Sequence, residues 1–335
     1  MHRVRLLSIF SSLLLSVTLL LTMFGSGCAT PAATEKPTIK LIEGDWTSQI
    51  VLTEIFDQII SKQLGYPTEK VLLAVSMGWA AMGKGDVDIG AEIWLPGRLP
   101  EVQPYLDKGT VELAGEIYTG GSGWVVPRFV IEGDPARGIE PMAPDLKSIL
   151  DLQTTEKGGK GYWQLFENPE NPGKGEVIYG SPGWNVPDRW MILGYDLPLW
   201  ESYQSEPIMM ARMIAADKKG QPLLLSIWWP HWIFAEVDLV VLEEPDPFNE
   251  ELIDYEKDPV PLKIGHPMYN VSKVVRTELK DTAPDVYRLV HNLVVGEDEI
   301  NTIMQRVEAD EEDMAVVAAD WISQNQNKID QWLSK

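Results

Sequence analysis

The sequence has one cysteine, Cys28, so no disulfide can form within a single chain. Histidine is almost as scarce: the chain has four, and His231, His266 and His291 lie far apart in the sequence. A zinc-type site needs several closely spaced His or Cys ligands, and we therefore expect no metal site. A glycine-rich phosphate loop with its lysine is also missing, so we expect no nucleotide cofactor, and any ATPase must be another chain.

Basic residues are few relative to acidic ones. The chain has 28 Lys and Arg against 50 Asp and Glu, for a formal net charge of −22. No basic face is available to neutralise phosphates, which excludes nucleic acid as a partner. The acidic balance is compatible with a cationic or zwitterionic small ligand. No Ser-His-Asp arrangement can be located.

Long apolar runs are confined to the N-terminus. Arg3 and Arg5 precede an apolar stretch from Leu6 to Phe24, and small residues then lead to Cys28. This pattern is typical of a targeting segment rather than of a fold element. It resembles a bacterial lipoprotein signal, in which the cysteine becomes the lipid-modified first residue. We therefore predict a signal peptide over residues 1–27 and a flexible tether over 28–37.

Two other interpretations of this segment remain open. The signal is cleaved without lipidation, or the apolar stretch, which is nearly long enough to span a bilayer, stays as an uncleaved anchor. Each interpretation places the rest of the chain outside the cytoplasm. The preferred one makes the protein an extracytoplasmic lipoprotein held at the membrane by a lipid on Cys28.

The remaining sequence alternates short apolar strands with amphipathic helices, which predicts an α/β fold with a mostly parallel sheet. We interpret the acidic, proline-containing segments at 132–144 and 243–259 as the two places where the chain crosses between lobes. They predict a discontinuous lobe I, residues 38–139 and 256–335, and a lobe II, residues 140–255. The tail from Pro284 to Trp332 is helical by pattern and is expected to cover lobe I.

Tryptophan is abundant, with 13 in the chain. Five turns at the ends of predicted strands carry it: Asp45-Trp46-Thr47, Ile93-Trp94-Leu95-Pro96, Gly123-Trp124, Pro182-Gly183-Trp184-Asn185 and Trp228-Trp229-Pro230-His231. Ligands bind at the carboxyl ends of strands in open α/β sheets. A methylated ammonium has no N–H to donate, and aromatic faces both attract its charge and cover its methyl groups. The pattern therefore favours a small quaternary ammonium ligand.

A zwitterionic ligand also needs donors for its carboxylate. Backbone N–H groups of Asn185 and Val186, and those of Thr47 and Ser48, precede predicted helices and are candidates. The side chain of His231 is a further candidate, although a histidine satisfied within its own turn explains it equally well.

Two charged residues have open roles in the sequence. Glu92 lies two residues before Trp94, hence on the same side of a strand, and faces either the cation or the lobe edge, of which we favour the edge. Arg98 either clamps a carboxylate or is an exposed loop residue, and we favour the exposed loop.

Three of these segments, in order, carry a family resemblance: Trp94-Leu95-Pro96, Gly183-Trp184 and Trp228-Trp229-Pro230-His231-Trp232. They resemble the substrate-binding proteins of ABC transporters for glycine betaine, proline betaine, choline and carnitine. The resemblance implies a two-lobed periplasmic-binding-protein fold of type II with a ligand cleft between the lobes. It also implies two partners, a membrane permease and its ATPase subunit.

Carried over by position, the resemblance implies a cation cage of Trp94, Trp184 and Trp228, with Trp46 and Trp124 as secondary positions. It also assigns the ligand carboxylate to the backbone after the Gly-Trp turn and, in some members, to His231. The sequence departs from the family pattern at Gly97-Arg98-Leu99, where many members have a histidine.

Two alternatives to this reading stay open. One is a receptor of the same fold for an amino acid or another zwitterion, which a position of Arg98 in the cleft would favour. The other is an extracellular carbohydrate-active enzyme, in which tryptophans stack on sugars and two carboxylates hydrolyse them. The leading interpretation is not an enzyme.

Overall fold

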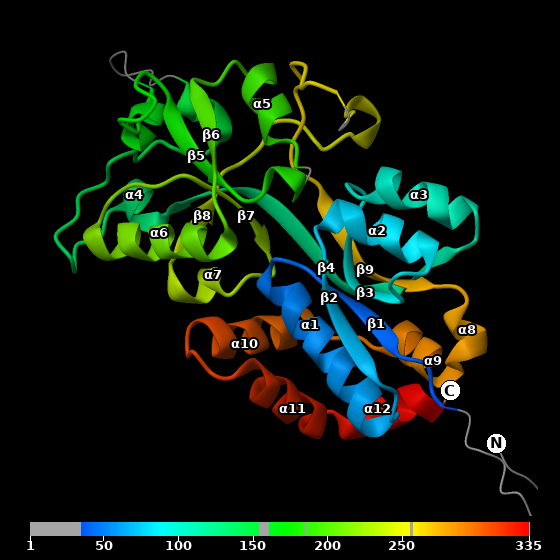
Figure 1. Ribbon diagram of the computed structural model, residues 1–335. Helices are drawn as coiled ribbons and strands as arrows, with labels where there is room; N and C mark the ends of the chain where they lie inside the picture. The colour runs from blue at the N-terminus through cyan, green and yellow to red at the C-terminus, as the bar shows by residue number, and fades with distance from the viewer. Residues whose placement is uncertain (1–34, 154–160, 185, 255–256, 335) are drawn as a thin grey trace, which may run out of the picture. The chain divides into compact units, whose positions relative to one another are not determined.

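A computed structural model describes residues 35–153, 161–184, 186–254 and 257–334 of the chain (Figure 1). The chain divides into two units, Met1–Glu35 and Lys36–Lys335, and the fold below belongs to the second. The predicted signal peptide, Cys28 and most of the tether lie outside the described residues.

The strands of the described residues form one sheet in the order β2-β1-β3-β9-β4-β7-β5-β6, with β8 paired to β4. Their bounds are β1 Ile39–Glu43, β2 Thr68–Leu72, β3 Ile89–Leu95, β4 Val111–Pro127, β5 Gly175–Tyr179, β6 Leu199–Tyr203, β7 Leu225–Trp229, β8 Leu239–Val241 and β9 Met268–Arg276. The fold is therefore α/β, as the sequence predicted, since helices connect most of these strands.

The sheet is mixed rather than mostly parallel. β1 runs parallel to β2 and β3, and β5 runs parallel to β6 and β7. Between these two groups, β9 is antiparallel to β3 and β4, and β4 is antiparallel to β7. This antiparallel centre was not predicted, because the sequence pattern indicated no strand at β9 and only the first residues of β4.

The long strand β4 joins the two halves of the sheet. Its first part, to Gly121, pairs with β9, and from Gly121 to Val125 it pairs with β7. Gly120 and Gly121 stand at this change of partner. A Cβ at Gly120 would lie 2.6 Å from the ring of Trp94, and one at Gly121 would lie 2.3 Å from the ring of Trp229. Glycine is needed here because indole rings pack directly on the strand.

The helices have the following bounds: α1 Thr47–Gln58, α2 Val75–Lys84, α3 Leu99–Asp107, α4 Arg128–Glu132, α5 Asp188–Gly194, α6 Glu206–Lys219, α7 Ile233–Glu236, α8 Leu279–Thr282, α9 Pro284–Asn292, α10 Glu297–Glu308, α11 Met314–Gln324 and α12 Gln326–Ser334. A π-helical turn, Ile59–Gln63, continues α1. Short 3₁₀ turns cover Ile149–Leu152, Tyr162–Phe166, Pro182–Trp184 and Glu250–Leu252. The helical tail predicted from Pro284 is confirmed as α9 to α12.

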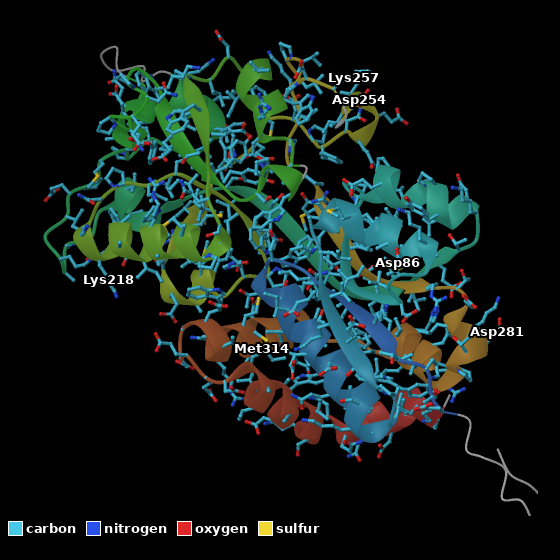
Figure 2. The ribbon with its side chains drawn as sticks, in the orientation of Figure 1. Asp86, Lys218, Asp254, Lys257, Asp281 and Met314 are labelled. Carbon is cyan, nitrogen blue, oxygen red and sulfur yellow. The ribbon has the colours of Figure 1, made fainter. Side chains whose placement is uncertain are left out.

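Helices cover both faces of the first half of the sheet. Alternate residues of β1 divide between the two layers, because Leu41 packs in the core with α1 and the tail helices while Ile42 packs with α2. α1 contacts α10 and α11, and α2 contacts α3 (Figure 1). Side chains fill the space between sheet and helices (Figure 2).

The second half of the sheet has a separate core on one face. Trp124, Val126 and Phe129 pack there with Leu146 and Val177. These residues of β4 and α4 come before the predicted crossing at 139/140, yet they pack with the following segment. Ile264, beyond the predicted return at 255/256, belongs to the same core. We therefore infer that the chain passes between the halves at Gly120–Gly121, within β4, and returns between Ile264 and the start of β9.

Candidate ligand pocket

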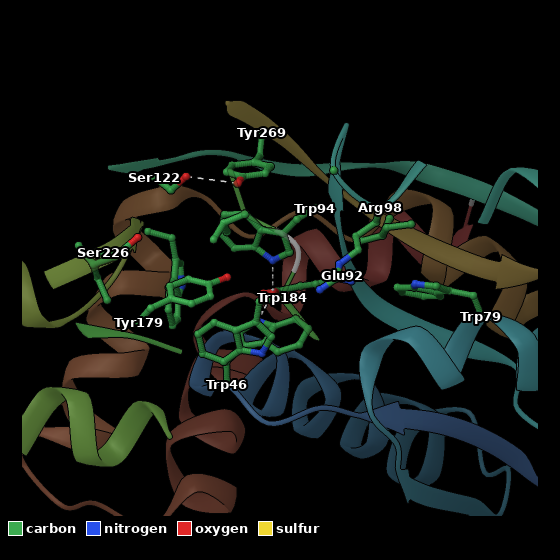
Figure 3. Close-up of a pocket in the computed structure, with 15 residues that line it drawn as sticks. Trp46, Trp79, Glu92, Trp94, Arg98, Ser122, Tyr179, Trp184, Ser226 and Tyr269 are labelled. Carbon is green, nitrogen blue, oxygen red and sulfur yellow. Dashed lines mark hydrogen bonds between the residues drawn. The ribbon is translucent and has the colours of Figure 1, made fainter. Parts of the chain in front are cut away.

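One pocket lies where the two halves of the sheet meet (Figure 3). The described residues that line it are Trp46, Trp79, Glu92, Ile93, Trp94, Gly97, Arg98, Ser122, Tyr179, Trp184, Val186, Ser226, Ile227, Trp228 and Tyr269. They come from the first half (β3, β9, α2, the start of α1 and the turn before α3), from the second half (β5, β7 and the turn after β5) and from β4. Seven of these fifteen residues are aromatic.

Local sequence places the tryptophans at the pocket. Trp94 and Trp228 stand near the carboxyl ends of β3 and β7, and a cis proline follows each end, Pro96 and Pro230. Trp184 ends the 3₁₀ turn that follows β5, and Trp46 is the N-cap residue of α1, after β1. Each of these segments follows a strand of a parallel group, which brings the rings to one edge of the sheet.

Neighbouring rings stand nearly perpendicular to one another. Trp184 lies 4.9 Å from Trp228 at 90°, 6.5 Å from Trp46 at 76° and 6.2 Å from Tyr179 at 88°, all between ring centroids. The contact between Trp46 and Trp184 joins the two halves. Edge-to-face contacts of this kind fix each ring against the next and leave the other faces to the cavity.

Trp94 forms the wall on the side of β9. Its ring contacts Tyr269 at 5.2 Å and 76° and Tyr118 at 6.2 Å and 74°. Tyr269 is buried, and its hydroxyl lies 3.2 Å from Ser122 Oγ, as Figure 3 shows. Trp46, Trp94, Trp184 and Trp228, four of the five tryptophans named from the sequence, therefore share one void.

Trp124 does not line this void, so the structure gives no support to its predicted secondary place in the cage. The ring is fully buried in the core of the second half, and its Nε1 donates to Asp188 Oδ1 at 2.5 Å. Ser122, two residues earlier on β4, reaches the pocket, whereas Trp124 lies one pleat further along the same face, beside α5.

The residue that receives the Trp124 indole belongs to a buried ionic cluster. His266 Nε2 lies 3.1 Å from Asp188 Oδ2, and His266 Nδ1 lies 2.5 Å from Glu244 Oε1. Burial alone disfavours the charged imidazole, but the carboxylates of Glu244 and Asp188 raise the pKa of His266 to about 10. Burial likewise works against ionised Asp188, yet His266 and the indole keep the pKa of that carboxyl below its usual value. The cluster ties the start of α5, just after Trp184 in the sequence, to the segment leading into β9.

Glu92 lies at the pocket, not at the lobe edge that the sequence analysis favoured. It is fully buried, and its Oε2 accepts from Trp46 Nε1 at 2.6 Å, Trp94 Nε1 at 3.0 Å and Ser48 Oγ at 3.2 Å. The hydroxyl of Tyr118 donates to Oε1. Burial raises the pKa of Glu92, and the four donors oppose that shift.

Arg98 is not the exposed loop residue that was favoured. It is buried and lines the pocket. Its guanidinium donates to Glu101 Oε1 at 2.8 Å and to the backbone carbonyl of Gly183 at 2.5 Å. The second bond crosses from the first half to the turn that carries Trp184, so Arg98 holds that turn beside the pocket.

The predicted carboxylate contacts have mixed outcomes. Val186 lines the pocket, and Asn185 lies outside the described residues. The backbone N–H of Thr47 donates to Glu206 Oε2 at 3.1 Å, so a carboxylate of the protein occupies the N-terminus of α1. His231, also buried, pairs with the same Glu206 at 3.0 Å. In this structure Glu206 thus engages the Thr47 N–H and His231, and Glu92 accepts from the Ser48 hydroxyl. Ligand contacts by Thr47, Ser48 and His231 stay a prediction.

Three buried donors of the pocket wall have no hydrogen-bond partner among the described residues. They are Nε1 of Trp79, the hydroxyl of Tyr179 and Nε1 of Trp228. Figure 3 shows the Tyr179 side chain reaching toward the rings. A buried donor without a partner is costly, which points to an acceptor on the ligand. Neither Tyr179 nor Tyr269 was predicted to line the pocket. Tyr179 stands at the carboxyl end of β5, and this position could have indicated a place near the ligand. Tyr269 lies on β9, which was not predicted.

The described residues contain no group of three His, Cys, Asp or Glu side chains that could hold a metal ion. A search of the same residues finds no helix with the length and apolarity that a membrane crossing needs. The site thus consists of aromatic rings, one buried carboxylate and a few donors.

Fold and pocket together define a solute-binding protein of the two-lobed periplasmic-binding-protein class. A family model described as the substrate binding domain of ABC-type glycine betaine transport systems, OpuAC, matches residues 37–324. The chain belongs to this family.

Individual relatives are distant. The glycine betaine/proline betaine-binding periplasmic protein of Escherichia coli is 23% identical over 318 residues, which cover 89% of each chain. The glycine betaine/carnitine transport binding protein GbuC of Listeria monocytogenes is 25% identical over 128 residues, 38% of this chain and 37% of the relative.

Solved structures share the fold. Lactococcal OpuAC in its closed-liganded conformation with glycine betaine has a TM-score of 0.67 and 19% identity, covering 89% of this chain and all of that one. An ABC-transporter choline binding protein in complex with choline has a TM-score of 0.67 and 22% identity, covering 89% of this chain and 91% of that one. The two-lobed fold that the sequence predicted is thereby confirmed.

Proposed function

We propose that this chain binds a quaternary ammonium solute, such as glycine betaine, proline betaine, choline or carnitine, in the pocket of Figure 3. The observation that carries the proposal is the convergence of four indoles from both halves, Trp46, Trp94, Trp184 and Trp228, around one void. Each ring is expected to contribute roughly 0.5–2 kcal/mol to the binding free energy of a methylated cation. No acceptor is needed for a nitrogen that has no N–H.

The polar end of the ligand is expected beside the unpartnered donors. The hydroxyl of Tyr179 and Nε1 of Trp228 are free to donate to a carboxylate or a hydroxyl. The backbone N–H groups of Asn185 and Val186 remain proposals for the same end, on the family resemblance. Tyr179 and Trp228 lie on neighbouring strands, β5 and β7, so one ligand group can reach both.

The proposed role is delivery of this solute to an ABC permease driven by a separate ATPase subunit, with no catalysis by this chain. Ligand shifts the protein toward a closed state only as far as it prefers that state. Contacts that cross between the halves, such as Arg98 to Gly183 and Thr47 to Glu206, are candidates for stabilising closure. We place the protein outside the cytoplasm, anchored by a lipid on Cys28, as the N-terminal segment suggests.

A specific observation favours a second candidate, a receptor for an amino acid or other zwitterion: Arg98 lines the pocket. Its guanidinium is engaged by Glu101 and the Gly183 carbonyl, which makes it less available to a ligand carboxylate. A glycoside hydrolase needs two carboxyl groups at the site. Glu92 is the single carboxylate among the described pocket residues, so the pocket offers no such pair.

A binding panel tests the proposal. Thermal shift followed by calorimetry would compare glycine betaine, proline betaine, choline and carnitine with proline and arginine, which lack a quaternary methylated nitrogen. We expect one or more of the first group to bind with one-to-one stoichiometry and to raise the melting temperature by several degrees. Binding of an unmethylated amino acid alone would favour the second candidate, and no binding by any quaternary compound would refute the proposal.

A further inference from the structure

Glu92 is a buried carboxylate to which two indoles of the pocket donate. Trp46, which precedes α1, and Trp94, on β3, come from separate segments, yet both Nε1 atoms reach Oε2 of this one side chain. An indole N–H can only donate, and an ionised carboxylate can only accept. One oxygen therefore fixes the direction of two rings.

The carboxylate has no cationic partner in the described part of the chain. None of the ion pairs there involves Glu92. Arg98, the one basic side chain among the described residues of the pocket wall, pairs instead with Glu101. Buried charges are normally paired, so an uncompensated carboxylate behind a cavity is an unusual arrangement. A cation in the cavity would compensate it.

We propose that Glu92 is a positioning residue: it orients Trp46 and Trp94, and its negative charge raises the affinity of the pocket for net cations relative to net-neutral zwitterions with the same head group. This inference rests on the proposed function and deepens it. The carboxylate acts through the rings, because hydrogen bonds from N–H groups polarise the indoles toward greater electron density at their faces. A positive charge in the cavity is also attracted directly across a low-dielectric space.

Choline and glycine betaine are suitable probes because they share a trimethylammonium head group. Choline has a net positive charge, whereas the carboxylate of glycine betaine makes it neutral overall. A charge at Glu92 therefore affects choline more, since the attraction to the ammonium of glycine betaine is offset by repulsion of its carboxylate. Loss of ring orientation alone affects both ligands alike.

The test is calorimetry of both ligands with Glu92→Gln. The wild-type protein and two controls are measured in parallel. Ser48→Ala removes one donor to Glu92 and keeps the charge. Glu69→Gln removes an exposed carboxylate on the edge strand β2 and changes the net charge by the same amount.

We expect Glu92→Gln to weaken choline binding at least tenfold and glycine betaine binding at most about threefold. Ser48→Ala should weaken both ligands by a similar small factor, and Glu69→Gln should change neither. Equal weakening of both ligands by Glu92→Gln would overturn the charge effect, and unchanged affinities would overturn the whole inference. If the wild-type protein bound neither ligand, the proposed function itself would fail, which is a separate outcome.

A second variant covers the case in which the buried glutamine prevents folding. Glu92→Met replaces the carboxylate by an apolar chain of similar length and leaves no buried amide. Its expected result is the same fall in choline affinity relative to glycine betaine, with folding checked by thermal denaturation. An unchanged ratio of the two affinities in Glu92→Met would overturn the inference.

Discussion

Trp228 and its neighbour Trp229 offer a matched pair for testing the cage. Successive side chains of a strand point to opposite faces, so the two rings at the end of β7 have different surroundings. Trp228 lines the pocket and contacts Trp184. Trp229 packs over Gly121 and lies 6.4 Å from Phe234. Both side chains are partly exposed, and substitution by alanine removes the same indole group from each.

The expected loss in Trp228→Ala follows from these contacts. One cation–π face contributes about 0.5–2 kcal/mol. The edge-to-face contact that orients Trp184 adds about 0.5–1.5 kcal/mol. Together they correspond to a roughly 5- to 300-fold weaker affinity for a quaternary ammonium ligand, at about 1.4 kcal/mol for each factor of ten.

Calorimetry with glycine betaine and choline measures this effect, with melting temperatures recorded for each variant. Trp229→Ala should lower the melting temperature, since it removes packing on β4, and leave the affinity of the folded protein within about twofold of wild type. Wild-type affinity in Trp228→Ala, or an equal loss in Trp229→Ala, would refute the assignment of the cage.

Two further predictions concern stability. Because the pKa of His266 is raised from 6.5 to about 10 in the folded state, its contribution is complete below pH 6.5 and is lost as the pH rises toward 10. At 1.36 kcal/mol per pKa unit, the part of the unfolding free energy due to His266 should fall by about 2–5 kcal/mol over that window. Denaturant titrations of wild type and His266→Gln should differ in this slope, and parallel curves would contradict the ion-pair cluster. Gly121→Ala places a Cβ 2.3 Å from Trp229 and should cost about 1–3 kcal/mol, whereas Gly183→Ala, whose Cβ would have its nearest atom at 3.7 Å, should cost less. Equal losses in the two glycine variants would argue against the close approach of Trp229 to β4.

The sequence was most informative where local rules act. Trp94 and Trp228 were expected at the carboxyl ends of strands, and the structure has them there, beside one cavity. The alternation of strand residues also placed Glu92 and Trp94 on the same side. That these residues bind a ligand stays a proposal, but their convergence could be anticipated from strand ends and parity alone.

Contacts between distant segments could not be anticipated in the same way. The N-terminus of α1 was a sound candidate for an anion, but the anion is Glu206, which is 159 residues away in the sequence. The four donors to Glu92 come from three separate segments, so the sequence could not reveal that this carboxylate lies at the pocket. Neither periodicity nor spacing records which carboxylate reaches which donor.

Trp124 and Tyr269 illustrate the limit set by strand assignment. Only the first residues of β4 were predicted, so the depth of Trp124 beyond the cavity could not be judged. β9 was not predicted, and Tyr269 on it was therefore overlooked. The lobe boundaries at 139/140 and 255/256 stay a prediction, and the packing of Trp124 and Ile264 in one core favours crossings nearer to Gly121 and β9.

A crystal structure of the protein with glycine betaine tests the central claim most directly. The account predicts the quaternary nitrogen within about 6 Å of the ring centroids of Trp94, Trp184 and Trp228. It also predicts the ligand carboxylate within hydrogen-bond distance of the Tyr179 hydroxyl or Trp228 Nε1. A nitrogen bound elsewhere, with these rings closed on one another, would contradict it.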